Sequence, residues 1–253
     1  MDKKLETYQD LCTQYYDLDK PFLPKDEWEF YLSYAKRSKG LILEPMCGTG
    51  RFLLPLLKKR FEIEGFDASD YMLEKLKKNA FSMGIQPCVW KGFLEDLTIS
   101  DRYDLIFIPA GSLNLIVDQE AALGGLKALY KALMYGGTFV FELIRKEFIE
   151  KVPVGVASSG SAYRNDGTWI TVTSVGTPVI DGVSSSSCRY TLFDGADILH
   201  TEMEEYKFRF YTDEQIKNLL SVVGFKDIRS MKAFVYNGEP DPNDMVIIYE
   251  CKK

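Results

Sequence analysis

The sequence has 253 residues and a hydrophobic content of 46%, enough for one large α/β domain or for a core domain with a sizeable insertion. Its net charge is −6, and its lysines and arginines form no run longer than three residues. A nucleic-acid binder more often carries a basic face. The charge therefore disfavours an RNA or DNA substrate, although an acidic chain can still hold a basic groove.

The cysteines and the N-terminus indicate the cellular setting. Five cysteines are scattered without a Cys-x-x-Cys pair, and a single histidine leaves few ligands for zinc. We therefore expect reduced thiols, a cytoplasmic protein and no metal site. The first ten residues lack the apolar core of a signal peptide, and no run approaches the ~20 apolar residues of a membrane span. We expect no membrane association.

The first 40 residues predict a helical cap. Aromatic residues and two prolines in residues 1–24 indicate a short helix followed by a loop. In residues 26–37 the apolar positions approximate one helical face, and Gly40 suits the end of that helix.

Residues 41–143 predict a parallel sheet covered by helices, because short apolar runs alternate with segments of helical period. Ser69 and Asp118 are good N-caps, and Pro55 should bend rather than break the first helix. The expected strands are 41–44, 63–66, 86–91, 105–108 and 138–143. The expected helices are 50–60, a second from Ser69 to Gly84, and a third from Asp118 to the Gly136-Gly137 pair.

Residues 152–210 change character. They are rich in Ser, Thr, Val, Gly and aromatic residues and have no helical period. Strands are expected at 169–175, 188–193 and 198–210, the last two joined at the turn pair Asp194-Gly195. We interpret this segment as an antiparallel insertion. A helix with a capping box at Thr212 and Gln215 follows, and then strands at 225–236 and 244–251.

Residues suited to ligand binding follow four of the predicted parallel strands. Glu44 and a glycine loop follow the first, and Asp67 follows the second. The segments 93–95 and 109–112 follow the third and the fourth. Open α/β sheets bind ligands at this edge, so the pattern predicts a nucleotide-like site. The loop Cys47-Gly48-Thr49-Gly50 lacks the Gly-x-Gly-x-x-Gly spacing of a dinucleotide site.

In order and spacing, these motifs resemble those of the class I S-adenosylmethionine-dependent methyltransferases. The resemblance spans residues 15–143 and 211–225. Its carriers are LILEPMCGTGRF, GFDAS, GFLEDL, YDLIFIPAGSLNLI, LMYGGTFVFEL and YTDEQIKNLLSVVGF. The sequence looks most like the small-molecule branch, which has an N-terminal Tyr-Asp element (here Tyr16-Asp17). The resemblance implies a Rossmann-like seven-stranded sheet, with S-adenosylmethionine as cofactor.

The resemblance also implies cofactor contacts. Glu44 would serve the ammonium of the methionine head, and Asp67 the ribose hydroxyls. Met72 would pack on adenine, unless it is simply a core residue. The family often has an acid after Gly92, where this chain has Phe93. The candidates to replace that contact are the Leu94 backbone, stacking by Phe93, and the side chains of Glu95 or Asp96. The full expected set is Tyr15, Tyr16, Glu44, Met46, Cys47, Gly48, Gly50, Arg51, Asp67, Ala68, Met72, Phe93, Leu94, Glu95, Pro109 and Ala110.

No catalytic base is evident, and the reaction does not require one. Tyr16, Ser112 and Asn114 are the candidates to orient the reacting groups, with packing or turn roles as the alternatives. His200 lies far from the motifs and is more typical of a surface or core residue. Methyl transfer is an in-line displacement on an activated sulfonium, so alignment and exclusion of water can supply most of the acceleration.

We expect two parts. Residues 1–151 and 211–253 would form the cofactor-binding core, with residues 1–40 as its cap. Residues 152–210 would form a β-rich substrate lid in which Tyr163, Trp169, Tyr190 and Phe208 contact the acceptor. The alternative is that these rings only hold the extra sheet together or form a homodimer interface. Three functions remain open: methyl transfer to a small-molecule nitrogen or oxygen, methyl transfer to RNA or protein, and non-catalytic cofactor binding.

Overall fold

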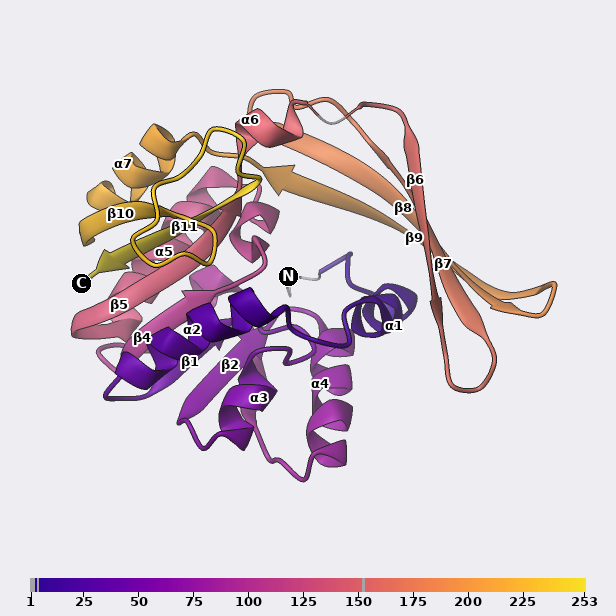
Figure 1. Cartoon of the computed structure of the whole chain (residues 1–253), viewed down its shortest axis with the longest axis horizontal. Coiled ribbons are helices and arrows are strands. Elements are labelled where there is room, and N and C mark those ends of the chain that lie inside the picture. Colours follow the sequence, from indigo (N-terminus) through magenta and orange to yellow (C-terminus); the bar gives the residue numbers. More distant parts are fainter. Residues whose placement is uncertain (1–2, 4, 152) are drawn as a thin grey trace.

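A seven-stranded sheet forms the centre of the protein (Figure 1). The computed structural model describes residue 3, residues 5–151 and residues 153–253. The strand order is β10-β11-β5-β4-β1-β2-β3, and β11 runs antiparallel to both of its neighbours. The strands are β1 (Ile42–Pro45), β2 (Ile63–Asp67), β3 (Cys88–Lys91), β4 (Tyr103–Ile108), β5 (Leu133–Ile144), β10 (Lys226–Lys232) and β11 (Val246–Lys252).

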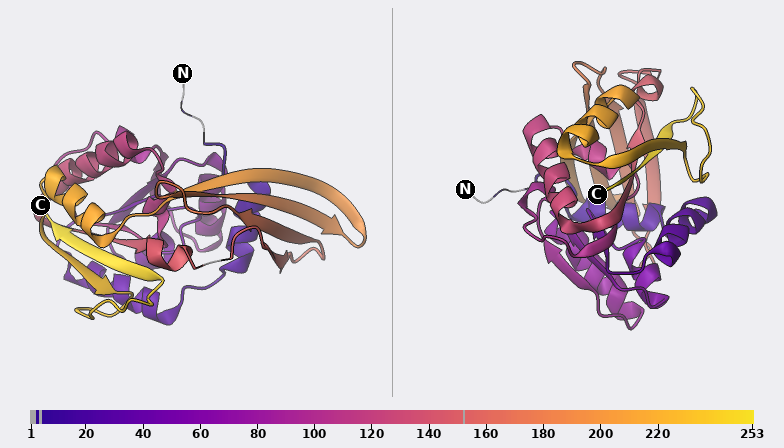
Figure 2. Two further views of the ribbon diagram at one scale, coloured as in Figure 1. Left: turned by 90° about the horizontal axis from the view of Figure 1, so that it is seen from above. Right: turned by 90° about the vertical axis from the view of Figure 1, so that its left-hand side faces the viewer.

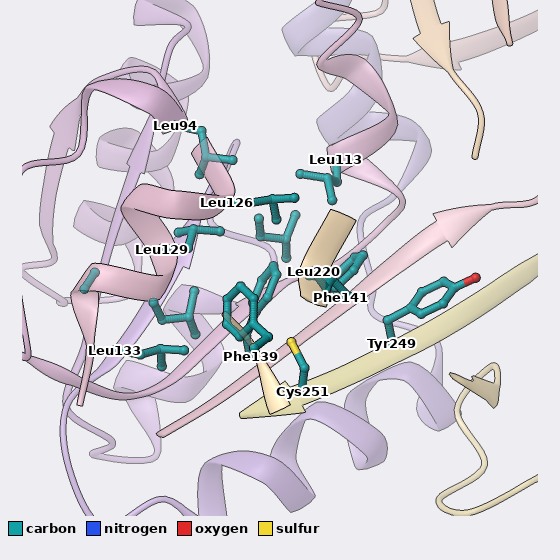
Figure 3. Packing of buried hydrophobic residues seen from close by; sticks show 14 of the residues in the cluster. Leu94, Leu113, Leu126, Leu129, Leu133, Phe139, Phe141, Leu220, Tyr249 and Cys251 are labelled. Carbon is teal, nitrogen blue, oxygen red and sulfur yellow. The ribbon is translucent and has the colours of Figure 1, made fainter. Parts of the chain in front are cut away.

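Helices cover both faces of this sheet because its central strands are apolar on both faces. Helices α2 (Lys25–Arg37), α3 (Leu53–Lys58) and α4 (Asp70–Ser82) pack on one face. Helices α5 (Gln119–Ala132) and α7 (Asp213–Val223) pack on the other. Alternate residues of β5 serve the two faces: Val140 belongs to the first cluster, whereas Phe139 and Phe141 lie at the centre of the second (Figure 3). The predicted fold class is confirmed.

A second sheet, residues 157–209, extends away from the core (Figures 1 and 2). We call it the second sheet. It is antiparallel throughout, in the order β6-β7-β8-β9. Its strands are β6 (Ala157–Tyr163), β7 (Trp169–Gly176), β8 (Val183–Asp194) and β9 (Asp197–Arg209), and the short helix α6 (Lys146–Ile149) precedes them.

Helix α1 (Asp10–Asp19) lies between the second sheet and the core. Leu11 and Cys12 pack into an apolar cluster with residues of β7, β8 and β9. On its other side, the Asp17 carboxylate accepts a hydrogen bond from Asn79 Nδ2 at 2.9 Å and pairs with Lys75 at 3.1 Å. The Tyr-Asp element thus docks α1 on α4.

Capping residues set the helix boundaries where the sequence predicted them. The Ser69 hydroxyl accepts the Met72 amide at 3.2 Å, and the Asp118 carboxylate accepts the Ala121 amide at 2.8 Å. Thr212 and Gln215 form the predicted capping box. Pro55 lies in the first turn of α3, where a missing N–H breaks no helical hydrogen bond.

Several elements differ from the prediction, among them the following. Helix α5 ends at Ala132 rather than at the glycine pair, because the Gly136 amide bonds to the Lys253 carbonyl at 3.1 Å and draws residues 133–137 into β5 as an irregular extension. Strand β6 was not predicted, since its small polar residues show no apolar alternation. Strand β10 ends at Lys232, and a turn at Val235 and Gly238 follows.

Among the described residues, no helix combines the length and the apolar character that crossing a membrane requires. Within the same residues, no group of three or more His, Cys, Asp and Glu side chains is placed to hold a metal ion.

Candidate functional site

A cavity of about 1220 Å³ lies between the carboxyl-terminal edge of the parallel sheet and the second sheet. The loops after β1 to β4 form one wall, and the N-terminal segment with β8 and β9 forms the other. The core wall contains Met46, Gly48, Asp67, Ala68, Met72, Phe93, Leu94, Glu95, Ala110 and Ser112. The opposite wall contains Tyr8, Cys12, Tyr15, Tyr16, Lys20, Ser186, Cys188, Tyr190, Met203, Glu204, Tyr206 and Phe208.

Asp67 stands at the end of β2 and organises the core wall. Its Oδ2 accepts the Gly48 amide at 2.8 Å, and its Oδ1 accepts the Ser69 amide at 2.9 Å. Desolvation in the cavity wall raises its pKa, and the hydrogen bonds from Ser69, Gly48 and Ala68 oppose that rise. The carboxylate is therefore held at the cavity by the glycine loop and by the start of α4.

Glu44 lies behind this wall at the end of β1 and is 2% exposed. Its Oε2 is buried and has no hydrogen-bond partner among the described residues, and the same holds for Arg51 Nε. Burial raises the pKa of Glu44 well above its ordinary value, and the nearby Arg51 guanidinium opposes that rise. Arg51 also pairs with Glu27 at 3.2 Å. Because buried polar atoms are usually paired, the Glu44 oxygen marks a position where a donor is missing.

The loops after β1 and β4 adopt backbone that is uncommon for side-chain-bearing residues. Met46 has φ +57° and Ala110 has φ +59°, both in the left-handed region. Such conformations persist only where the surroundings fix them, and they cluster at functional sites. Both residues line the cavity, whereas the expected contacts Cys47, Gly50, Arg51 and Pro109 lie behind its surface.

Gly50 is needed for packing. A Cβ at this position would lie 2.8 Å from Leu54 Cγ and 3.0 Å from Leu76 Cγ, and the residue has φ +84°. The loop after β1 can approach α3 and α4 this closely only because Gly50 has no side chain.

The loop after β3 carries Phe93 at the position where the resembled family often has an acidic residue. Phe93 lines the cavity, and Lys3 Nζ lies 5.5 Å from the centre of its ring. The same ammonium pairs with Glu95 and Asp96, each at 2.8 Å. Leu94 is 3% exposed and packs in the core, so its backbone faces the cavity more than its side chain does. Both carboxylates of this loop are thus already engaged by Lys3.

The orienting candidates separate into two groups. Tyr15, Tyr16 and Ser112 line the cavity, and burial raises the pKa of the Tyr16 hydroxyl. Asn114 is fully buried. Its side-chain Nδ2 donates to the Arg209 backbone carbonyl at 2.8 Å, and its Oδ1 accepts the Ile144 backbone amide at 2.9 Å. Asn114 therefore ties the loop after β4 to both sheets and does not line the cavity.

Of the four residues expected to contact the acceptor, two line the cavity and two do not. Tyr190 and Phe208 line the cavity, but Tyr163 and Trp169 do not. Tyr163 is 72% exposed, and Trp169 stacks on Phe193 with ring centres 5.5 Å apart. They flank the turn between β6 and β7, at the far end of the second sheet from the core (Figure 1). His200 is exposed and lies 3.4 Å from Glu202.

Sequence reasoning missed much of the second-sheet wall. Cys188 and Tyr190 on β8 and Glu204, Tyr206 and Phe208 on β9 lie at alternate positions, as residues on one face of a strand do. That period was the signal available for Cys188 and Tyr206. Glu204 lies on the same period, but nothing in the sequence distinguishes it from the other glutamates of the strand.

Sequence reasoning also missed Glu142, which lies near the end of β5 and is 3% exposed. The Tyr31 hydroxyl donates to Glu142 Oε1 at 2.6 Å. The Glu142 carboxylate also accepts a hydrogen bond from the backbone amide of Ala110. Burial raises its pKa to about 7. Glu142 thus helps to fix the loop after β4, through its hydrogen bond from Ala110.

Known proteins similar to this chain are methyltransferases. A family model described as "Methyltransferase domain" matches residues 42–137. Residues 42–137 match a methyltransferase domain. "Putative methyltransferase YqeM" of Bacillus subtilis (strain 168) is 28% identical over 138 residues, which are 54% of this chain and 55% of that protein. The match thus spans about half the length of this curated relative.

Solved structures extend the likeness of this methyltransferase domain to nearly the whole chain. An S-adenosylmethionine-dependent methyltransferase from Clostridium acetobutylicum ATCC 824 has a TM-score of 0.77 at 22% identity, covering 94% of this chain and 96% of that one. The sugar N-methyltransferase KedS8 from Streptoalloteichus sp ATCC 53650 has a TM-score of 0.75 at 17% identity, covering 100% and 96%. At these identities the likeness shows the fold. The predicted class is confirmed, and S-adenosylmethionine is the expected cofactor.

Proposed function

We propose that this protein transfers a methyl group from S-adenosylmethionine to a nitrogen or an oxygen of a small molecule. The observation that carries the proposal is the cavity: strand-end loops with Asp67 form one wall, and the second sheet with α1 closes it from the other side. Its volume of about 1220 Å³ exceeds the ~300–1,000 Å³ of a typical ligand pocket. There is room for the cofactor and for a small acceptor.

The residues fit the cofactor. The unpartnered Oε2 of Glu44 lies behind the cavity wall, so the ammonium of the methionine head can satisfy it through a bridging water. Asp67 can accept hydrogen bonds from the ribose hydroxyls in addition to the two amides that hold it. Met72 and Phe93 both line the cavity and offer apolar surface to the adenine.

The cofactor supplies a methyl group already activated on a sulfonium, and the chain supplies alignment and exclusion of water. We assign the second sheet, within residues 152–210, as a substrate lid over the core formed by residues 1–151 and 211–253. Tyr15, Tyr16, Tyr190 and Phe208 would confine the acceptor. An amine acceptor needs only to arrive neutral, so no residue has to act as a strong base.

The charge of the cavity favours a small acceptor over a nucleic acid. Of the described residues that line it, eight are acids and three are lysines. Lys91 pairs with Asp70 at 2.5 Å, and Lys207 lies 3.9 Å from Glu205. A phosphate backbone would be repelled here. The names of KedS8, a sugar N-methyltransferase, and of CalS10, an amino pentose methyltransferase, add support for a small acceptor.

Two measurements test the proposal. Calorimetric titration with S-adenosylhomocysteine should show binding by the folded protein, and absence of binding would refute cofactor use. Radiolabel from S-adenosylmethionine should then pass to a pool of cell metabolites and not to RNA or protein. Transfer to macromolecules would overturn the small-molecule assignment. Binding without transfer to any acceptor would favour a non-catalytic binding protein.

A further inference from the structure

The N-terminal end of α1 lacks a cap of its own. The residue before the helix is Gln9, whose side chain makes no capping hydrogen bond. The first amides of a helix have no partner within the helix and need one from elsewhere. Here the partners come from strand β9, about 190 residues later in the chain: Glu202 Oε2 accepts the Leu11 amide at 2.8 Å.

Glu204 makes the larger contribution at this junction. Its Oε2 accepts the Tyr8 amide at 2.7 Å, and its Oε1 accepts the Gln9 amide at 2.9 Å. The Tyr206 hydroxyl donates to the same carboxylate. Glu204 is 4% exposed, so its charge is stabilised by these donors and by the positive end of the α1 dipole rather than by water.

The peptide at Tyr8 is held from the core side as well. The Ser69 hydroxyl donates to the Tyr8 carbonyl at 2.7 Å, and the Ser69 amide donates to Asp67 Oδ1 at 2.9 Å. Tyr8 has φ +57°, a conformation that a tyrosine keeps only when its surroundings impose it. Tyr8 is thus fixed between Glu204 of the second sheet and the N-cap of α4, one hydrogen bond away from Asp67.

We propose that Glu204, with Glu202 beside it, is a positioning residue that holds the N-terminal segment (residues 5–20) across the cofactor end of the cavity. The inference rests on the proposed function, because it takes the cofactor to bind at Asp67. Members of this segment, including Tyr8, Tyr15 and Tyr16, line the cavity. A bound cofactor and a docked segment therefore stabilise each other through Ser69 and Tyr8.

Glu204→Gln tests this role with little change of shape. The glutamine keeps one oxygen acceptor but turns an NH₂ group toward the second amide. Hydrogen exchange of peptides covering residues 5–20 should become faster, and the affinity for S-adenosylhomocysteine should fall about tenfold, the scale for losing one hydrogen bond to a charged group. Asp197→Asn, on an exposed position of the same strand, is the matched control and should leave both readouts unchanged.

A double-mutant cycle separates positioning from general stability. Ser69→Ala removes the hydroxyl that holds the Tyr8 carbonyl from the core side. Because both changes release the same peptide, their effects on S-adenosylhomocysteine affinity should be less than additive. Strictly additive losses would overturn the inference, as would an affinity loss at Glu204→Gln with unchanged exchange in residues 5–20.

The outcomes also separate this inference from the proposed function. Wild-type protein that fails to bind S-adenosylhomocysteine refutes both, and is seen without any variant. Wild-type binding together with a Glu204→Gln variant of equal affinity and exchange refutes the inference alone. If Glu204→Gln does not fold, Glu202→Gln removes a single acceptor from the same helix end and should show the same two changes on a smaller scale; its failure to do so refutes the inference.

Discussion

The two walls of the cavity are built on different principles. The core wall consists of loops at the ends of parallel strands, in which backbone amides and partly buried carboxylates such as Asp67 hold one another in place. The wall of the second sheet consists of side chains on alternate positions of two long antiparallel strands, among them Tyr190 and Tyr206. The first depends on chain geometry, and the second on the identity of individual side chains.

This difference suits the division of labour that we propose. A loop made of backbone presents the same groups whatever the neighbouring side chains are, which suits an unchanging cofactor. A face made of side chains can change residue by residue without disturbing the strand pairing behind it. Acceptor recognition can therefore vary on the second sheet while the cofactor site stays the same.

The largest effect should come from filling the close approach in the core wall. Gly50→Ala places a Cβ 2.8 Å from Leu54 Cγ at φ +84° and should lower the free energy of unfolding by about 2–5 kcal/mol. Gly84→Ala is the matched control, because Gly84 has φ +67° but nothing within 4 Å of the added atom. Denaturant unfolding of both variants isolates the packing part. Equal losses would show that the backbone conformation alone is responsible.

The next effect concerns pH. The pKa of Glu142 is raised to about 7 from 4.5. Below pH 4.5 the carboxyl is protonated in both the folded and the unfolded state and contributes nothing. Between pH 4.5 and about 7 the Glu142 carboxyl is ionised in the unfolded state and still protonated in the folded state, so the free energy of unfolding falls as the pH rises. Above about pH 7 the carboxyl is ionised in both states, and the full loss of stability is present.

Glu142→Gln keeps one oxygen to accept the Ala110 amide, turns its NH₂ group to the Tyr31 hydroxyl oxygen, which can accept it, and removes the titration. The variant should match wild type near pH 4.5 and exceed it by up to about 3 kcal/mol at pH 8, from the pKa change that burial causes. Urea unfolding at a series of pH values measures the difference. A difference that does not depend on pH would contradict the assigned cause.

A smaller effect is expected on cofactor binding. Asp67→Ala should weaken the affinity for S-adenosylhomocysteine by about 1–3 kcal/mol, the scale for losing a charged hydrogen-bonding partner. Asp67→Asn keeps the shape and one acceptor, and should lose less. Calorimetry gives both values. An unchanged affinity in the alanine variant would show that the ribose is held elsewhere.

The smallest effect is expected on the second sheet. Tyr206→Phe removes the hydroxyl that donates to Glu204 and lies 2.7 Å from Cys12 Sγ. Thermal unfolding should show a loss of about 1.5 kcal/mol, the low end of the scale for a hydrogen bond to a charged group. Tyr163→Phe, at a side chain that is 72% exposed, should leave the melting temperature unchanged. A loss as large as that of Gly50→Ala would mean that this wall is as rigid as the core wall.

Residues of the core wall could be predicted because short stretches of sequence determine their positions. Glu44, Asp67 and the caps at Ser69 and Asp118 each follow or precede an element whose period is visible within a dozen residues. Parallel strands then bring their carboxyl ends to one edge of the sheet, which gathers residues far apart in the sequence without further information.

Only some residues of the opposite wall could be predicted, because their positions depend on pairing between distant segments of the chain. Tyr190 and Phe208 could be named from their aromatic character, but Tyr163 and Trp169 share that character and lie at the far end of the second sheet. Strand register decides which rings face the cavity, and register cannot be read from composition. Glu204 and Glu142 were out of reach for the same reason: their partners are Tyr8 and Tyr31.

The capping of α1 by Glu202 and Glu204 also sets an order of assembly. The hydrogen bonds from residues 8, 9 and 11 to these carboxylates span 191 to 196 positions of the chain. Contacts between such distant residues form late, because a long loop must close before they are gained. During synthesis α1 emerges long before β9, so these carboxylates reach its leading amides only after β9 has been made. Residues 8–11 are therefore expected to be among the last of the described residues to reach their final contacts.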